Sequence, residues 1–166
     1  MWFDKEADEA AKLYTSIFKG SKIKEITTLS NTPSGTVEIV TAELAGQKFT
    51  LMSAGPYFKF NPSVSFLVAC NTKREVESIW KKLFDGATVL MDLASYPFSE
   101  RYGWLQDKYG LSWQIMFIRN HKMSQKIVPT IMFVGNVSGK AEDAIKFYVS
   151  VFKNSKIGSI LRYGKG

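Results

Sequence analysis

The sequence predicts an α+β fold in which tandem βαβββ units form a curved mixed sheet with helices on its convex side. Three observations support this prediction. A helix followed by a strand occurs near the start of the chain and again near its end. Before residue 118, the order of one helix and then three strands occurs twice. Short turn sequences separate the strands. Such units can place their sheets edge to edge, which leaves a concave face for a ligand.

The first helix and its following strand recur as an internal repeat. Residues 7–26 and 141–160 align at a constant offset of 134 residues, and eleven of their twenty positions are identical. Apolar residues of the first copy recur at helical spacing, and Asp4 stands where an N-cap oxygen is expected. Gly20 and Asn154 are expected to end the two helices, because glycine and asparagine best tolerate a left-handed backbone.

The first unit continues after this helix with three predicted strands. Ala45-Gly46 reads as the turn of a tight hairpin between the second and third of them. In order, we expect a short strand at residues 1–3, strands at 22–29, 36–44 and 47–53, a loop at 30–35, and a connecting segment at 54–62.

The second unit repeats the order of strand, helix and three strands. Its helix begins at a capping box, Thr72-x-x-Glu75, and ends at Gly86. In the strand before the helix, alternation places Ser63, Ser65 and Leu67 on one face. The remaining elements are expected as strands at residues 63–70, 87–92, 102–106 and 111–117, a loop at 93–100, and a turn at 107–110 that contains Asp107 as a turn residue.

The repeat also predicts how the chain divides into domains. Residues 1–117 form one complete domain of two βαβββ units, and residues 118–125 form a linker. Residues 126–166 then read as a partial third unit of strand, helix and strand, with its first strand at residues 126–133. We therefore expect this part to be the start of a second, truncated domain, and the sequence to be a fragment of a longer two-domain protein.

Charge and composition argue against several classes of function. The net charge is +7, but residues 1–117 are neutral and the excess lies entirely in residues 118–166, so we expect no nucleic-acid partner. Cys70 is the only cysteine, which excludes an intramolecular disulfide and suits a reducing compartment. No apolar run approaches the length of a membrane span, so we expect a cytoplasmic protein with no membrane partner.

Three segments carry a resemblance to a known family. MWFDKEADEAAKLYTSIFKGSKI, PYFKFNPSVSFLVACNT and YGWLQDKYGLSWQI resemble the PhnB-like proteins, often labelled demethylubiquinone methyltransferase-like. These proteins belong to the vicinal oxygen chelate superfamily of glyoxalases, bleomycin-resistance proteins and dioxygenases. The sequence contains no glycine-rich loop for S-adenosylmethionine, so we do not expect methyltransferase activity.

The resemblance implies where a metal would bind, and this sequence lacks the expected ligands. Metal-dependent members carry His, Glu or Gln at inward positions of the first and last strand of each unit. Gln114 falls on the place of a glutamate ligand, and Ser63 on the place of a histidine. A neutral hydroxyl is a poor ligand for a divalent cation, and His121 lies in the linker, where we expect a solvated loop residue. We therefore expect neither a metal nor another cofactor.

A pocket on the concave face is the remaining candidate site, and it would take a small molecule of unknown identity. Trp113 alternates with Gln114 and is expected to pack beneath a helix instead. The residues expected to line the pocket are Ser53, Phe58, Phe60, Ser63, Ser65, Trp104 and Gln114.

Three functional hypotheses remain open. The first is a small-molecule binding protein without a metal. The second is a metal-dependent enzyme of glyoxalase or dioxygenase type, whose ligands come from missing segments or a second subunit. The third is a structural or assembly module, in which residues 126–166 pair an open sheet edge with another chain. The resemblance also implies a homodimer, because tandem units of this superfamily often pair between subunits.

Overall fold

The computed structural model describes residues 1–119 and 125–162, so the expectation for His121 lies outside the described residues. The chain divides into two compact units, Met1–Thr130 and Ile131–Gly166. Among the described residues, no helix is long and apolar enough to cross a membrane.

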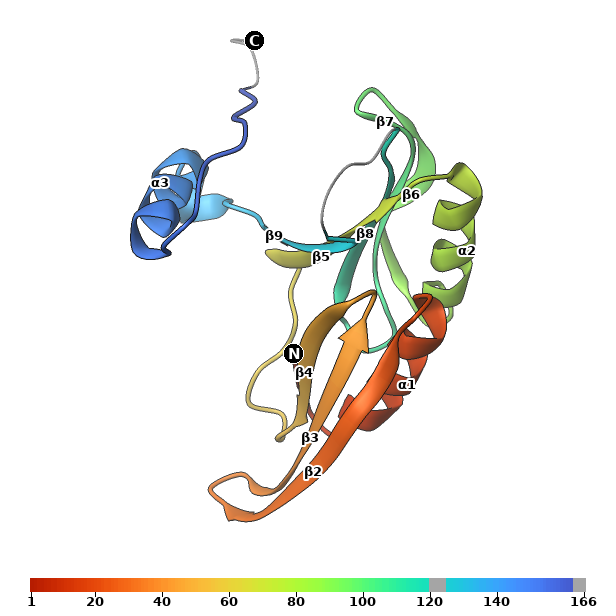
Figure 1. The fold of residues 1–166 in the computed structure, drawn as a ribbon, viewed down its shortest axis with the longest axis vertical. Coiled ribbons are helices and arrows are strands. Elements are labelled where there is room, and N and C mark those ends of the chain that lie inside the picture. Colours follow the sequence, from red (N-terminus) through yellow and green to blue (C-terminus); the bar gives the residue numbers. More distant parts are fainter. Residues whose placement is uncertain (120–124, 163–166) are drawn as a thin grey trace. The chain divides into compact units, whose positions relative to one another are not determined.

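The first sheet is built from the N-terminal βαβββ segment (Figure 1). Its spatial order is β1-β4-β3-β2, with β1 parallel to β4 and the other neighbours antiparallel. The Ala45-Gly46 hairpin is confirmed, because both residues have positive φ, at 48° and 85°, as a tight two-residue turn requires. The elements are β1 (Trp2–Phe3), α1 (Ala7–Ile17), β2 (Lys22–Thr32), β3 (Gly35–Leu44) and β4 (Gln47–Ser53).

The second sheet has the same internal arrangement. Its spatial order is β6-β7-β8-β5-β9, in which β5 is parallel to β8 and the hairpin strands are antiparallel. β5 therefore takes the place that β1 takes in the first sheet. The elements are β5 (Val64–Cys70), α2 (Lys73–Leu83), β6 (Thr88–Tyr96), β7 (Ser99–Gln106), β8 (Ser112–Phe117) and β9 (Ile127–Ile131).

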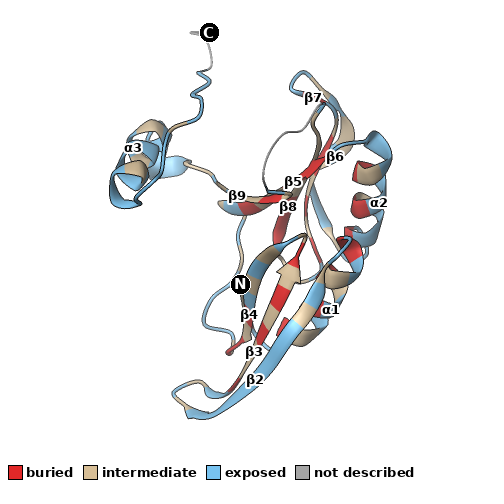
Figure 2. Ribbon diagram, in the orientation of Figure 1, coloured by how far each residue is buried: buried red, intermediate tan, exposed pale blue. Residues whose placement is uncertain are grey.

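The helices α1 and α2 cover the same side of the two mixed sheets, which together form the curved β-structure of the fold (Figure 1). Buried residues lie along the strands and on the sides of α1 and α2 that face them (Figure 2). One apolar cluster joins both βαβββ units, and Phe49 of β4 meets Phe66 of β5 edge to face at 5.6 Å. The opposite side of the second sheet is covered by neither α1 nor α2, and we call it the helix-free face (Figure 1).

Several local expectations from the sequence are wrong. The loop expected at residues 30–35 is reduced to residues 33–34, because β2 continues to Thr32 and β3 begins at Gly35. The strand expected after the third helix is not formed in residues 152–162. The loop expected at residues 93–100 is mostly strand, because β6 and β7 form a long hairpin with only residues 97–98 outside it. Asp4 does not cap α1: the N-cap residue is Glu6, which makes no side-chain cap hydrogen bond. The hydroxyl of Ser53 instead accepts a hydrogen bond from the backbone N–H of Ala7 at 3.0 Å. A cap supplied from 46 residues away leaves no local signal in the sequence.

Gly103 on β7 supports α2 by leaving room for Trp80. A methyl group at this position would lie 2.4 Å from Cζ3 of Trp80 and 2.8 Å from its Cε3. We expect Gly103→Ala to lower the free energy of unfolding by about 1–3 kcal/mol, because the indole must move. Urea unfolding followed by circular dichroism measures the change.

Gly158→Ala is the matched control for this prediction, since a methyl group there would meet no atom within 4 Å. The double variant Gly103→Ala/Trp80→Leu should recover part of the loss, because the smaller side chain vacates the space. Equal effects of the Gly103 and Gly158 substitutions would contradict the packing argument.

The second compact unit contains a helix with an uncovered apolar side. This unit contains η1 (Gly135–Val137) and α3 (Ala141–Val151). As expected, the residues that end α1 and α3 have a left-handed backbone, with a φ of 76° at Gly20 and 62° at Asn154. Phe147, Val151 and Phe152 of this unit are 64%, 54% and 63% exposed. The proposal that residues 126–166 begin a second domain stays a prediction, with β9 lying on the edge of the second sheet beside β5.

Candidate functional site

Three polar side chains form a hydrogen-bonded chain across the helix-free face of the second sheet. The strand register aligns Ser65 with Ser112 and Trp104 with Gln114, so these side chains emerge on one face. The Tyr102 hydroxyl donates to Oε1 of Gln114 at 2.7 Å. The Gln114 amide, Nε2, in turn donates to Oγ of Ser65 at 2.7 Å. The sequence predicted Ser65 and Gln114 as pocket residues, and the structure places them in contact.

Tyr102, which sequence reasoning missed, fixes the orientation of this chain. Burial raises the pKa of the Tyr102 phenol to about 12, so the hydroxyl remains a donor at neutral pH. Its ring lies edge to face against Phe98 at 5.0 Å and Tyr96 at 5.6 Å. The only signal available in the sequence was its spacing of two residues from Trp104, which puts both side chains on one face of the strand.

Trp104 lies beside this chain on the same face and is half-buried. Its indole Nε1 donates to Oγ of Ser112 at 2.7 Å, which holds the ring against the sheet. A cavity of about 250 Å³ opens at the β6–β7 end, where Tyr96, Phe98 and Met116 line it. The face therefore combines an amide, hydroxyl groups and aromatic rings.

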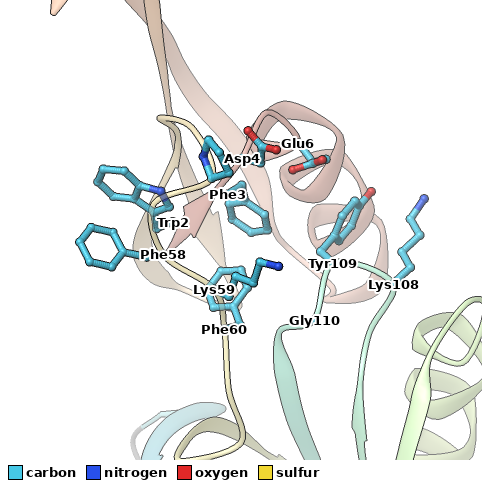
Figure 3. Close-up of a pocket in the computed structure, with 11 residues that line it drawn as sticks. Trp2, Phe3, Asp4, Glu6, Phe58, Lys59, Phe60, Lys108, Tyr109 and Gly110 are labelled. Carbon is cyan, nitrogen blue, oxygen red and sulfur yellow. The ribbon is translucent and has the colours of Figure 1, made fainter. Parts of the chain in front are cut away.

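Phe58 and Phe60 lie elsewhere, in a separate aromatic cavity of about 460 Å³ (Figure 3). Trp2 and Phe3 of β1, the connecting segment before β5 and the turn before β8 surround this cavity. The sequence grouped Phe58 and Phe60 with Gln114, whereas the structure assigns them to a different cavity.

Ser53 and Ser63 make structural contacts away from the polar chain of the second sheet. Ser53 is buried and its hydroxyl is occupied by the N–H of Ala7. Ser63 precedes β5, and its backbone N–H donates to Oδ1 of Asn61 at 2.9 Å. Neither contact involves the Tyr102–Gln114–Ser65 chain.

The side chains on the helix-free face do not fit a divalent metal. In residues 1–119 and 125–162, no three His, Cys, Asp or Glu side chains gather in a way that could hold one. Two of the groups on this face, the Ser65 hydroxyl and the Gln114 amide, already bond to each other. The Tyr102–Gln114–Ser65 chain therefore consists of neutral hydrogen-bonding groups.

The sequence predicted Asp107 only as a turn residue, whereas the structure shows that its carboxylate is buried. It accepts hydrogen bonds from the Tyr14 hydroxyl at 2.7 Å and from Nε1 of Trp113 at 2.9 Å. It also accepts the backbone N–H groups of Tyr109 and Leu111, which confirms it as a turn residue. Burial raises the pKa of the Asp107 carboxyl, and these four hydrogen bonds oppose that rise. We assign Asp107 to the structural core.

Comparison with known families identifies the chain. A sequence profile described as 3-demethylubiquinone-9 3-methyltransferase matches residues 1–116 and 125–166. The chain belongs to this family. The family match covers both βαβββ units and restarts shortly before β9, and the PhnB-like resemblance of the sequence is thereby confirmed.

One solved structure supports membership in the 3-demethylubiquinone-9 3-methyltransferase family, and two more distant ones share the fold. The chain is 36% identical to the PhnB protein of Bacillus cereus, with 71% of this chain and 95% of that chain covered and a TM-score of 0.66. A glyoxalase family protein from Bacillus cereus shares 11% identity, with 72% and 91% covered and a TM-score of 0.52. A glyoxylase/bleomycin resistance protein/dioxygenase domain from Frankia sp. shares 14%, with 72% and 88% covered and the same TM-score.

The two distant structures show the fold alone, which confirms the expected glyoxalase/bleomycin resistance/dioxygenase-like architecture. No curated protein matches the chain at a significant level.

Proposed function

We propose that this protein binds a small molecule on the helix-free face of the second sheet, without a protein-bound metal. The observation that carries the proposal is the chain from Tyr102 through Gln114 to Ser65, which holds a half-buried amide in one orientation. A few fixed polar groups among apolar ones are typical of ligand sites. Trp104 beside the amide offers a flat surface on which a ring can pack.

Gln114→Leu tests the proposal because it keeps the size of the side chain and removes the amide. With a fragment library followed by ¹H–¹⁵N NMR, bound fragments should shift the side-chain signals of Gln114 and Trp104. We expect Gln114→Leu to weaken the best fragment about tenfold, which corresponds to one lost hydrogen bond.

Gln125→Leu is the matched control, because Gln125 is an exposed glutamine outside the sheet face. Fragment shifts confined to other surfaces would refute the proposed face. Stoichiometric zinc, nickel, iron or manganese in the purified protein would instead support the metal-dependent alternative.

The exposed side of α3 favours a second candidate, association with another copy of the chain. Tyr14 and Phe18 of the first copy of the repeat are buried, at 0% and 4% exposed. Their counterparts Tyr148 and Phe152 are 38% and 63% exposed. An apolar side that is buried in one copy of a helix and open in the other suits a protein interface.

Sedimentation of the full chain and of a chain ending at Phe117 tests this homodimer. The full chain should sediment as a dimer, and the double variant Phe147→Ser/Phe152→Ser as a monomer. A monomeric full chain would refute the assembly role and leave the small-molecule site standing.

A further inference from the structure

The aromatic cavity beside β1 is a second candidate binding site, formed by other residues than the helix-free face. Its volume of about 460 Å³ lies in the range of small-molecule sites. Figure 3 shows aromatic rings on both sides of it, contributed by β1, by the connecting segment before β5 and by the turn before β8. Neither Gln114 nor Ser65 lines it.

The rings around the cavity are held in place. Trp2 and Phe58 pack edge to face at 5.1 Å, and Nε1 of Trp2 donates to the carbonyl of Gly55 at 2.8 Å. Phe3 packs edge to face against Phe60 at 5.1 Å and Tyr109 at 6.0 Å. Phe58 is nevertheless 67% exposed. Its open ring can therefore take a second aromatic ring without the loss of an existing contact.

One of the two lysines at the cavity already has a partner. Lys108 forms an ion pair with Glu9 at 2.6 Å, and the Tyr109 hydroxyl donates to the same carboxylate at 2.7 Å. These contacts raise the pKa of Lys108 and lower that of Glu9, so both groups stay charged and paired. Lys108 therefore pairs with the carboxylate that also holds Tyr109, and it contributes little net charge to the cavity.

Three charged groups remain to face a ligand. Asp4 and Glu6 lie at the start of α1, and Lys59 reaches into the cavity from the connecting segment (Figure 3). None of the three forms an ion pair with another of the described residues. A carboxylate pair thus lies on one side of the aromatic rings, and an ammonium group lies nearer the rings of Phe60 and Tyr109 (Figure 3).

From this arrangement we infer that the cavity binds a small zwitterion with an aromatic group, such as an aromatic α-amino acid. The ring of the ligand packs against Phe58 and Trp2. Its ammonium group pairs with Asp4 and Glu6, and its carboxylate pairs with Lys59. A ligand with only one charge would leave the opposite set of groups unpaired or repelled.

Three probes that share the same ring and chain length separate the contributions of the two charged groups. They are L-phenylalanine, phenethylamine, which lacks the carboxylate, and 3-phenylpropionate, which lacks the ammonium group. Isothermal titration of the full chain at low salt should rank L-phenylalanine tightest, by about fivefold over each analogue, as expected of one exposed ion pair. Lys59→Ala should weaken L-phenylalanine and 3-phenylpropionate about fivefold and leave phenethylamine unchanged. Phe58→Ala should weaken all three.

Lys48→Ala is the matched control, since Lys48 is an exposed lysine on β4 away from the cavity. Gln114→Leu should leave L-phenylalanine binding unchanged, which separates this site from the proposed function. Equal affinities for the three probes, no measurable binding of any probe, or the same result for the Lys59 and Lys48 variants would overturn the inference. Circular dichroism of each variant checks that it is folded.

Discussion

Replacing Asp107 by alanine is expected to lower the free energy of unfolding by about 3–5 kcal/mol, because buried donors lose a charged acceptor. Tyr14 and Trp113 are fully buried, and both direct their polar hydrogen at Oδ2 of Asp107. Burial raises the pKa of the Tyr14 phenol, so this group stays protonated and keeps a hydrogen that needs an acceptor. Urea unfolding followed by circular dichroism measures the loss.

Two variants test the cause of the Asp107 effect. Asp107→Asn keeps an acceptor oxygen and should cost less than the alanine change. Asp85→Ala, at an exposed carboxylate, should change the free energy of unfolding by less than about 0.5 kcal/mol. If Asp107→Ala and Asp85→Ala lowered the free energy of unfolding by equally small amounts, water would have to replace the Asp107 carboxylate as the acceptor.

The second large effect is expected at Trp113, where alanine should cost about 3–5 kcal/mol. The indole is fully buried among three aromatic rings. Its ring centroid lies 5.2 Å from that of Tyr14 of α1, 5.7 Å from that of Phe18 and 5.5 Å from that of Phe66 of β5. It therefore fastens the first βαβββ unit to the second sheet. Trp113→Phe keeps a ring but loses the N–H, so we expect a smaller loss, measured by the same urea unfolding.

Trp104→Ala is the comparison for Trp113, because Trp104 lies half-buried on the opposite face. It should cost clearly less. The double variant Asp107→Ala/Trp113→Ala should cost less than the sum of its parts, since the two side chains share a hydrogen bond. Additive losses would mean that the hydrogen bond contributes nothing to stability.

Local features were predicted well where a few neighbouring residues carry the signal. The N-cap half of the capping box is confirmed, because Oγ1 of Thr72 accepts the N–H of Glu75 at 3.1 Å. The Glu75 carboxylate accepts the backbone N–H of Asn71, one residue before the N-cap, at 2.9 Å. Trp113 packs beneath α1, as its alternation with Gln114 indicated. The order of strands and helices followed from spacing and turn residues, although the β6–β7 hairpin is longer than expected.

The candidate site was predicted only in part, because its contacts join distant segments. Gln114 and Ser65 are in contact although 49 residues separate them in the chain. The spacing of Tyr102 from Trp104 indicates a shared face, but it does not indicate that Tyr102 donates to Gln114. Phe58 and Phe60 read as walls of the same pocket. Their place was decided by the connecting segment, which packs them on Trp2 and Phe3 of β1.

The sequence alone was enough to establish two βαβββ units, the Ala45-Gly46 turn and the residues that end the first and third helices, because these depend on hydrophobic period and on backbone conformations that few residues tolerate. Only the tertiary structure determined which polar groups form hydrogen bonds with each other. Tyr14 and Asp107 lie 93 residues apart in the chain, yet their side chains share one buried hydrogen bond. Such a contact depends on the register and packing of two separate βαβββ units, and neither leaves a local pattern in the chain.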